Sequence, residues 1–233
     1  MLWVCFGLFL AYFVGFELYW GLARYPGIMA AIADGRTKKT SLYIRMMTGL
    51  WIPAGLVLAL LALRQVSPVE LGLNGFRLHG NRWFVGVAAA VAGLYLAYLV
   101  YCLIVLRRNA IKKIKLDQPL PDTVRILLPA TPREKRVWIC TALTAGFAEE
   151  LLFRGFLFYL LGALLPQLPP VAVVGISSVV FGVGHAYQGA AEALKPLVLG
   201  VVYGVFYLAF GTLLPCIVLH ALQDLSATDI LND

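Results

Sequence analysis

Charged side chains are scarce in this sequence of 233 residues. Asp, Glu, Lys and Arg make up 13% of it, whereas 61% of the residues are hydrophobic and the mean hydropathy is +0.84. Soluble domains carry about 25% charged residues, so a soluble globular protein is excluded. The apolar segments follow one another so closely that they leave no stretch for a separate soluble domain. The sequence therefore predicts an all-α fold, a polytopic helical bundle in the membrane.

Several motifs of enzyme chemistry are also missing. There is no Gly-x-Ser-x-Gly turn and no cysteine beside a histidine, which disfavours a serine or cysteine nucleophile. No His-Glu-x-x-His pattern indicates a zinc-binding helix. The four cysteines are scattered through apolar segments without Cys-x-x-Cys spacing, as expected of small buried side chains and not of a disulfide framework or metal cluster (Cys5, Cys102, Cys140 and Cys216).

Acidic residues are outnumbered by basic ones, and the net charge is +7. The Lys and Arg residues gather in short loops beside apolar segments, which is typical of membrane topology and not of a nucleic-acid surface. Five of them lie in residues 24–45 and nine in residues 107–136, whereas the loop at residues 64–82, on the opposite side, holds three. The positive-inside rule then places the N-terminus outside and the C-terminus in the cytoplasm.

Seven apolar segments are expected to span the membrane: residues 2–23, 46–63, 83–106, 137–164, 171–187, 196–210 and 213–227. The sequence does not decide between seven and eight spans, because residues 112–128 could hold a re-entrant segment. Residues 24–45 are expected to be a basic polar loop. Residues 107–136 are either a basic cytoplasmic loop or, in part, an amphipathic turn or two on an anionic leaflet. We divide this one membrane domain into a three-span region, residues 1–136, and a four-span core with the candidate site, residues 137–233.

Two adjacent glutamates and an arginine interrupt the fourth apolar segment. Charge within a span costs roughly 2.5–3.5 kcal/mol per group on insertion scales, so such residues are functional candidates by default. Glu150 and Arg154 are four residues apart and share a helix face, whereas Glu149 lies about 100° further round the helix. One carboxylate is thus expected to pair with the arginine, which leaves the other for chemistry. The alternative is a structural ion-pair cluster that fixes this helix to a neighbour.

Two further spans carry ionisable residues. His185 lies at the end of the fifth apolar segment, and His220 and Asp224 are four residues apart on the seventh. Together with the glutamates they predict one polar cavity inside the bundle. There a carboxylate could deprotonate water, and a histidine could donate to the oxyanion that forms when water attacks an amide. Glu149, His185 and His220 could also ligate a metal ion, which their spacing leaves open.

Three motifs in order, Glu149-Glu150-x-x-x-Arg154, Phe181-x-x-x-His185 and His220-x-x-x-Asp224, carry a family resemblance. They resemble the signature of the CAAX prenyl protease type II and bacteriocin-processing family, also named CPBP or Abi. Its members are intramembrane endopeptidases of the glutamic type. The similarity covers roughly residues 142–224, and the loop at residues 70–73 is weakly similar.

This resemblance implies roles for six residues: Glu149 as the general base that activates water, His185 as the group that positions this water, His220 and Asp224 as the oxyanion-stabilising pair, and Glu150 and Arg154 as structural support. Some relatives have Asn at the last position. Because an ionised Asp224 cannot donate a hydrogen bond, it would have to be protonated or to act by orienting His220.

The expected function is hydrolysis of a peptide bond in a membrane-associated polypeptide by glutamate-activated water, without a cofactor. The expected partners are the bilayer and a polypeptide substrate, not nucleic acid, and the expected location is the cell (plasma) membrane, as a multi-pass protein. Prenylated tails, leader peptides and C-terminal sorting helices are all open as substrates. The alternative is a non-catalytic scaffold, immunity factor or transporter-like protein that uses the cavity for binding or proton relay.

Overall fold

The computed structural model describes residues 1–111, 126–188 and 190–227, and every regular element in these ranges is a helix. The N-terminal part consists of α1 (Leu2–Leu10), the π-helical η1 (Ala11–Glu17), α2 (Leu18–Ala23), α3 (Tyr25–Ala33), α4 (Lys39–Ala62) and α5 (Arg82–Ile111). The C-terminal part consists of α7 (Pro132–Glu150), the π-helical η2 (Leu151–Phe156), α8 (Leu157–Leu164), α9 (Pro170–Gly184), the short 3₁₀ helix η3 (Ala186–Gln188), α10 (Ala190–Phe210) and α11 (Leu214–Ser226).

Four helices are long and apolar enough to cross a membrane: Leu2–Ala33, Lys39–Ala62, Arg82–Val105 and Ala193–Phe210. The helices α9 and α11 are apolar but shorter, and α7, η2 and α8 follow one another without a break. The all-α class is confirmed, and the chain is an integral membrane protein by the length and composition of its helices. The count of seven spans and the orientation of the termini stay predictions.

One local expectation was wrong, because residues 24–45 do not form a loop. They contain α3 and the first two turns of α4. Tyr25, Met29 and Ile32 recur at helical spacing and are buried together with Leu42 in one apolar cluster. This narrow apolar face is enough to hold α3 as a helix, although the surrounding basic residues lower the hydropathy of the segment. Residues 112–125, which include most of the suggested re-entrant piece and the amphipathic turns, lie outside the described residues.

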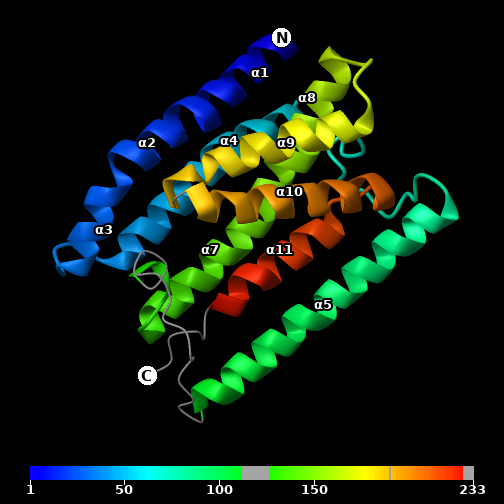
Figure 1. Ribbon diagram of the computed structural model, residues 1–233. Coiled ribbons are helices and arrows are strands. Elements are labelled where there is room, and N and C mark those ends of the chain that lie inside the picture. Colours follow the sequence, from blue (N-terminus) through cyan, green and yellow to red (C-terminus); the bar gives the residue numbers. More distant parts are fainter. Residues whose placement is uncertain (112–125, 189, 228–233) are drawn as a thin grey trace.

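Figure 1 shows the helices side by side, with α5 along one edge of the bundle, packed on α10 and α11. The end of α5, the start of α7 and the end of α11 lie toward the same end of the bundle as the turn between α3 and α4 (lower left in Figure 1). The α4–α5 connection and the turn between α8 and α9 lie at the opposite end. The α3–α4 turn and the two helix ends on either side of residues 112–131 therefore lie at one end of the bundle, and we call these two links the basic connections.

The first helix and the glutamate helix share a core. Phe9 and Phe13 pack on Phe153, with ring centroids 5.6 and 4.9 Å apart, and all three belong to the largest buried apolar cluster. Such aromatic pairs contribute about 0.5–1.5 kcal/mol beyond the area they bury. The helix that carries the candidate site is thus held from the N-terminal side as well as by α9 and α11.

The connection between α4 and α5 covers the core at the end away from the basic connections. Leu71 is fully buried, and the carbonyl of Gly72 accepts a hydrogen bond of 2.9 Å from the amide of Leu213. Gly72 has φ +68°, a left-handed conformation that favours glycine. The Ser67 hydroxyl and amide donate to Glu70, and these hydrogen bonds hold the pKa of that carboxyl below its usual value. This segment seals one end of the bundle.

A glycine sets the close approach of α7 and α11. A Cβ atom at Gly146 would lie 2.9 Å from the backbone nitrogen of Ala221, so the two helices would have to separate. We expect Gly146→Ala to destabilise the protein by about 1–3 kcal/mol, as overpacking does. Gly162→Ala is the matched control, because open space surrounds that helical glycine, and alanine should gain up to about 1 kcal/mol there. Thermal unfolding in detergent checks both; equal midpoints for the two variants would contradict the prediction.

Candidate active site

A buried ion pair lies at the centre of the bundle, at the junction of α7 and η2. Arg154 donates through Nη1 to Glu150 Oε1 at 2.9 Å, and neither side chain is exposed to solvent. The expected pairing of Arg154 with Glu150 and not with Glu149 is confirmed. The guanidinium group of Arg154 also lies over the rings of Phe181 and Tyr203, 4.6 and 5.6 Å from their centroids. This charge is thus held by one carboxylate and two aromatic rings.

The π-helical segment η2 begins directly after the two glutamates. Single π turns inside α-helices occur often at functional sites, because the extra residue shifts the side chains that follow. Here the Glu150–Arg154 pair survives this shift. All six residues of η2 are buried, so the altered turn is fixed by packing.

His220 on α11 joins the two glutamates of α7. Its Nδ1–H donates to Glu150 Oε1 at 2.7 Å. Its Nε2 lies 3.7 Å from Glu149 Oε2 and 3.8 Å from Asp224 Oδ2. The ring of Tyr203 stacks on the imidazole, with centroids 5.6 Å apart. A histidine 70 residues from the glutamates in sequence is thereby fixed between three carboxylates.

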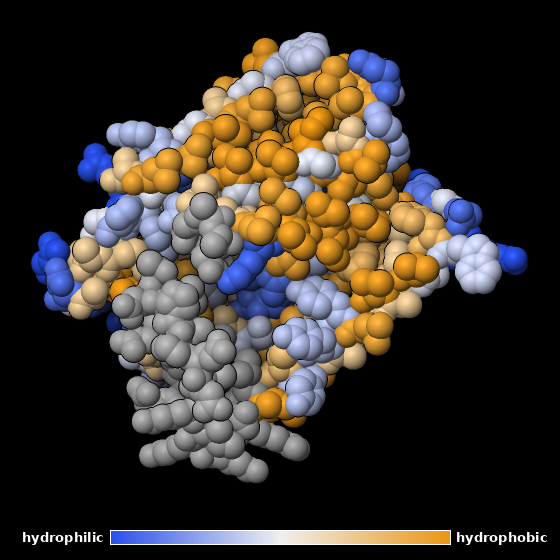
Figure 2. All heavy atoms as spheres, in the orientation of Figure 1, coloured by the Kyte–Doolittle hydropathy of each residue, from blue (hydrophilic) through white to orange (hydrophobic). Residues whose placement is uncertain are grey.

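The four residues predicted to be catalytic line one cavity of about 290 Å³: Glu149, His185, His220 and Asp224. Glu149 Oε2 is buried and has no hydrogen-bond partner among the described residues. The Asp224 side chain is 29% exposed, so the cavity opens to solvent beside this residue. Figure 2 shows hydrophilic atoms in a recess on this face, bordered by apolar surface. The cavity is large enough to admit a short length of polypeptide backbone together with water.

His185 is fixed from its own helix. It caps the C-terminal end of α9, and its Nδ1–H donates to the carbonyl of Phe181 at 2.8 Å. In the neutral ring this bond leaves Nε2 as the hydrogen-bond acceptor. The imidazole is flanked by Phe181, with centroids 4.6 Å apart, and by Tyr187, at 6.2 Å. His185 is thus held in one tautomer and one orientation beside the cavity that Glu149 lines.

Sequence reasoning missed part of the surroundings of the site. A smaller cavity of about 90 Å³ is lined by Glu149 and His185 and also by Glu17, Trp20 and Arg45 of the first membrane helix and α4. The Arg45 guanidinium lies 3.8 Å from the centroid of Trp20. No pattern in the sequence links these residues to the glutamate helix, because their approach depends on how the helices pack.

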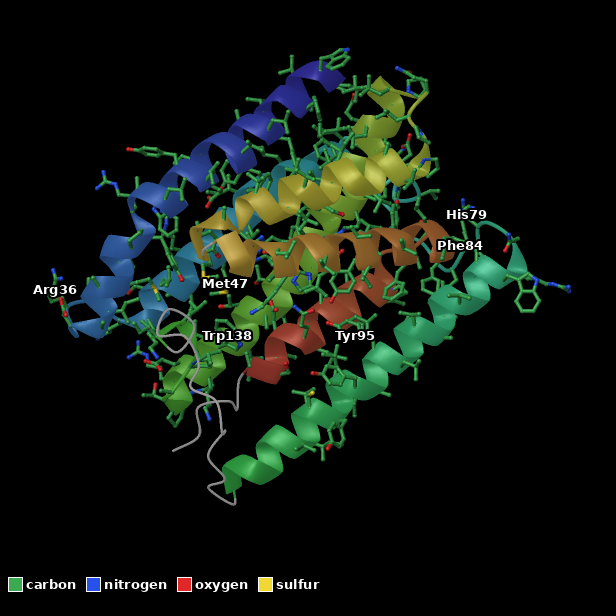
Figure 3. All side chains as sticks on the ribbon, in the orientation of Figure 1. Arg36, Met47, His79, Phe84, Tyr95 and Trp138 are labelled. Atoms are coloured by element: carbon green, nitrogen blue, oxygen red, sulfur yellow. The ribbon has the colours of Figure 1, made fainter. Side chains whose placement is uncertain are left out.

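Three aromatic residues hold the part of α11 that carries Asp224. Tyr95 of α5 and Tyr203 of α10 both donate through their hydroxyls to Gln223 Oε1. Trp138 of α7 donates through Nε1 to the carbonyl of Asp224 at 2.9 Å. Figure 3 shows Tyr95 on the side of α5 that faces α11, and Trp138 on α7. Three different helices thus fix the last turns of α11.

The donor set does not fit a metal ion. Among the described residues, no group of three or more His, Cys, Asp or Glu side chains is placed to hold one. The ligand set of Glu149, His185 and His220 that the sequence left open is therefore not assembled in this geometry.

Comparisons with known proteins bear on the same helices. Residues 133–226 match the family model described as type II CAAX prenyl endopeptidase Rce1-like, and this range runs from the start of α7 to the end of α11. Comparison with curated proteins gives no match, and neither does comparison with solved structures. The match contains all six residues to which the motifs assigned a role. The match supports the resemblance found in those motifs: residues 133–226 are similar to the type II CAAX prenyl endopeptidase Rce1-like family.

Proposed function

We propose that this protein is an intramembrane endopeptidase that hydrolyses a peptide bond by means of a water molecule activated by Glu149. The observation that carries the proposal is the unpartnered Oε2 of Glu149, which lies 3.7 Å from His220 Nε2 in a cavity shared with His185. Burying a carboxylate that accepts no hydrogen bond costs free energy of folding. Such a group in a native structure is therefore a candidate for a catalytic role. The match to a protease family supports the same conclusion.

Each residue that lines the cavity has a part in this mechanism. Glu149 takes a proton from water, and the Nε2 lone pair of His185 orients the same water by accepting its second hydrogen. The hydroxide attacks the carbonyl carbon, and His220 donates from Nε2 to the oxygen that becomes negative. Asp224, whose Oδ2 lies 3.8 Å from that nitrogen, stabilises the protonated imidazole by its negative charge. This proposed role suits an aspartate, because it needs no proton on Asp224.

The substrate is a membrane-associated polypeptide cut near the cytoplasmic face. The cavity is lined by the last turns of α11 and by Lys195, on the side of the bundle toward the basic connections. Those connections stay in the cytoplasm by the positive-inside rule. A chain anchored in the same leaflet would therefore present its juxtamembrane peptide bonds at the height of Glu149.

A cleavage assay tests the proposal. The full-length protein is reconstituted in liposomes and incubated with a farnesylated peptide ending in Cys-aliphatic-aliphatic-X, and separately with the same peptide without the lipid. Mass spectrometry should find two products of a single hydrolysis, and added hydroxylamine should give no hydroxamate, because no acyl-enzyme forms. A hydroxamate would contradict direct attack by water. The assay is repeated with a leader peptide and with a membrane-anchored sorting tail. If none of the three is cut, the result favours the non-catalytic scaffold or transporter-like alternative.

Chelation is expected to leave the cleavage rate unchanged. No three His, Cys, Asp or Glu side chains converge to hold a metal ion within the described part of the chain. The rate is compared before and after dialysis against EDTA. A loss of activity that one divalent metal restores would show that water is activated by a metal ion and not by Glu149 alone.

A further inference from the structure

Both ring nitrogens of His220 face carboxylates. On one side Nδ1 lies 2.7 Å from Glu150 Oε1, and on the other side Nε2 lies 3.7 Å from Glu149 and 3.8 Å from Asp224. His220 is 6% exposed and Glu150 is not exposed at all. The Nδ1–H position is therefore fixed by a short, buried, charge-assisted hydrogen bond. The nitrogen directed at the cavity is always Nε2.

The charges around His220 favour a ring that carries both protons. The titratable groups around it come from five elements: Glu149 and Glu150 of α7, Arg154 of η2, His185 of α9, Tyr203 of α10 and Asp224 of α11 itself. Three of them are carboxylic acids and only Arg154 is a permanent cation. An imidazolium ion at the centre offsets a second carboxylate in a region where unpaired charge is expensive.

We propose that Glu150 is the positioning residue of His220 and that His220 gives its Nε2 proton to the nitrogen that leaves the cleaved peptide bond. The inference rests on the proposed function and adds to it the source of the leaving-group proton. Glu150 and Arg154 then have a part in the chemistry and are not only structural support. The arrangement of carboxylate, imidazole and reacting atom matches the way an aspartate orients the histidine of serine proteases.

The steps balance. Water gives one proton to Glu149 Oε2, and its oxygen bonds to the carbonyl carbon while the carbonyl electrons move to oxygen. The Nε2–H of His220 first donates a hydrogen bond to this oxyanion. As the electrons return and the C–N bond breaks, the nitrogen takes the bonding electron pair and receives that same proton from Nε2. Glu149 passes the proton from water to the neutral Nε2 of His220 across the 3.7 Å that separates them. One water is consumed, one carboxylic acid and one amine are formed, and all side chains return to their first state.

A leaving-group comparison tests this assignment. The probe is the farnesylated peptide of the assay above, made with the normal amide or with an ester at the bond to be cut. An alkoxide leaves without prior protonation far more readily than an amide nitrogen, so the ester needs little help from a general acid. We compare the wild-type protein with Glu150→Gln, which keeps the shape and an acceptor oxygen but not the charge, and with Glu150→Asp, which keeps the charge.

We expect Glu150→Gln to lower kcat/KM for the amide by about 100-fold or more and for the ester by less than about tenfold, within the usual range of general acid catalysis. Glu150→Asp should recover part of the amide rate. Ser178→Ala is the matched control, since that serine is equally buried but bonds only to its own helix. Both rates come from one sample, so their ratio does not depend on the fraction of folded protein. An unchanged ester-to-amide ratio in Glu150→Gln would overturn the proposal.

Nitrogen-15 NMR of the histidines gives a readout that needs no substrate. The sequence has only three histidines, and the signals of His220 are identified by their loss in His220→Gln. We expect Nδ1 of His220 to carry a proton in the wild-type protein and to lose its hydrogen-bonded shift in Glu150→Leu. An unprotonated Nδ1 in the wild-type protein would refute the positioning role, even if peptide cleavage itself were established. If the wild-type protein cuts neither probe, the proposed function fails, and this spectrum alone decides the role of Glu150.

Discussion

Replacing Glu149 with Gln is expected to lower kcat for peptide cleavage by about 10²–10⁴-fold, the usual contribution of a positioned general base. Gln has the shape of Glu and keeps one acceptor oxygen, but it cannot take a proton from water. KM should change little, because Glu149 contacts the water and not the side chains of the substrate. The rate is measured with the farnesylated peptide in liposomes, at equal amounts of folded protein.

The matched control is Glu70→Gln, which makes the same chemical change in the exposed α4–α5 connection, away from the cavity. Its activity should stay close to that of the wild-type protein. The Glu149→Gln protein should be no less stable than the wild-type protein, since a neutral amide is easier to bury than an unpartnered carboxylate. Full cleavage activity in Glu149→Gln would remove the glutamate from the mechanism and leave its burial unexplained.

The helices were predictable from the sequence because membrane insertion leaves a strong local signal. Each of the seven apolar segments corresponds to a helix, and the helix from Arg82 begins one residue before the segment expected to start at Trp83. The failure at α3 has a local cause. Three apolar side chains are enough to bury one face of that helix, while averaging over the whole segment mixes them with arginines and lysines.

In the candidate site, only contacts between residues of the same helix were predictable from the sequence. Glu150 and Arg154 were expected to pair because residues four apart share a face, and they do. The hydrogen bond from His220 to Glu150 was not foreseen. It depends on the approach of α7 and α11 at Gly146, and the sequence alone does not tell which helices touch there. The same holds for Glu17, which lines a cavity together with Glu149 although it lies in the first helix.

Loss of the buried arginine is expected to have the largest effect on stability. Arg154→Ala removes the one permanent cation beside Glu150 and leaves the space of a large side chain among Phe181 and Tyr203. Removing one partner of a buried ion pair typically costs about 3–5 kcal/mol, because the remaining charge is uncompensated. That is a large fraction of the total stability of a domain, so the variant should unfold far more easily in mixed SDS micelles or fail to accumulate.

A double replacement distinguishes the free-energy cost of leaving Glu150 unpaired from the contribution of the whole ion pair to stability. Glu150→Leu combined with Arg154→Met removes both charges and fills the space with apolar side chains of similar volume. Such exchanges are often neutral in stability, so the double variant should unfold much later than Arg154→Ala. Recovery should stop short of the wild-type protein, because Nδ1–H of His220 then has lost its acceptor. Cleavage should not return, since nothing then orients His220. A double variant that is stable and also active would show that the pair serves packing alone.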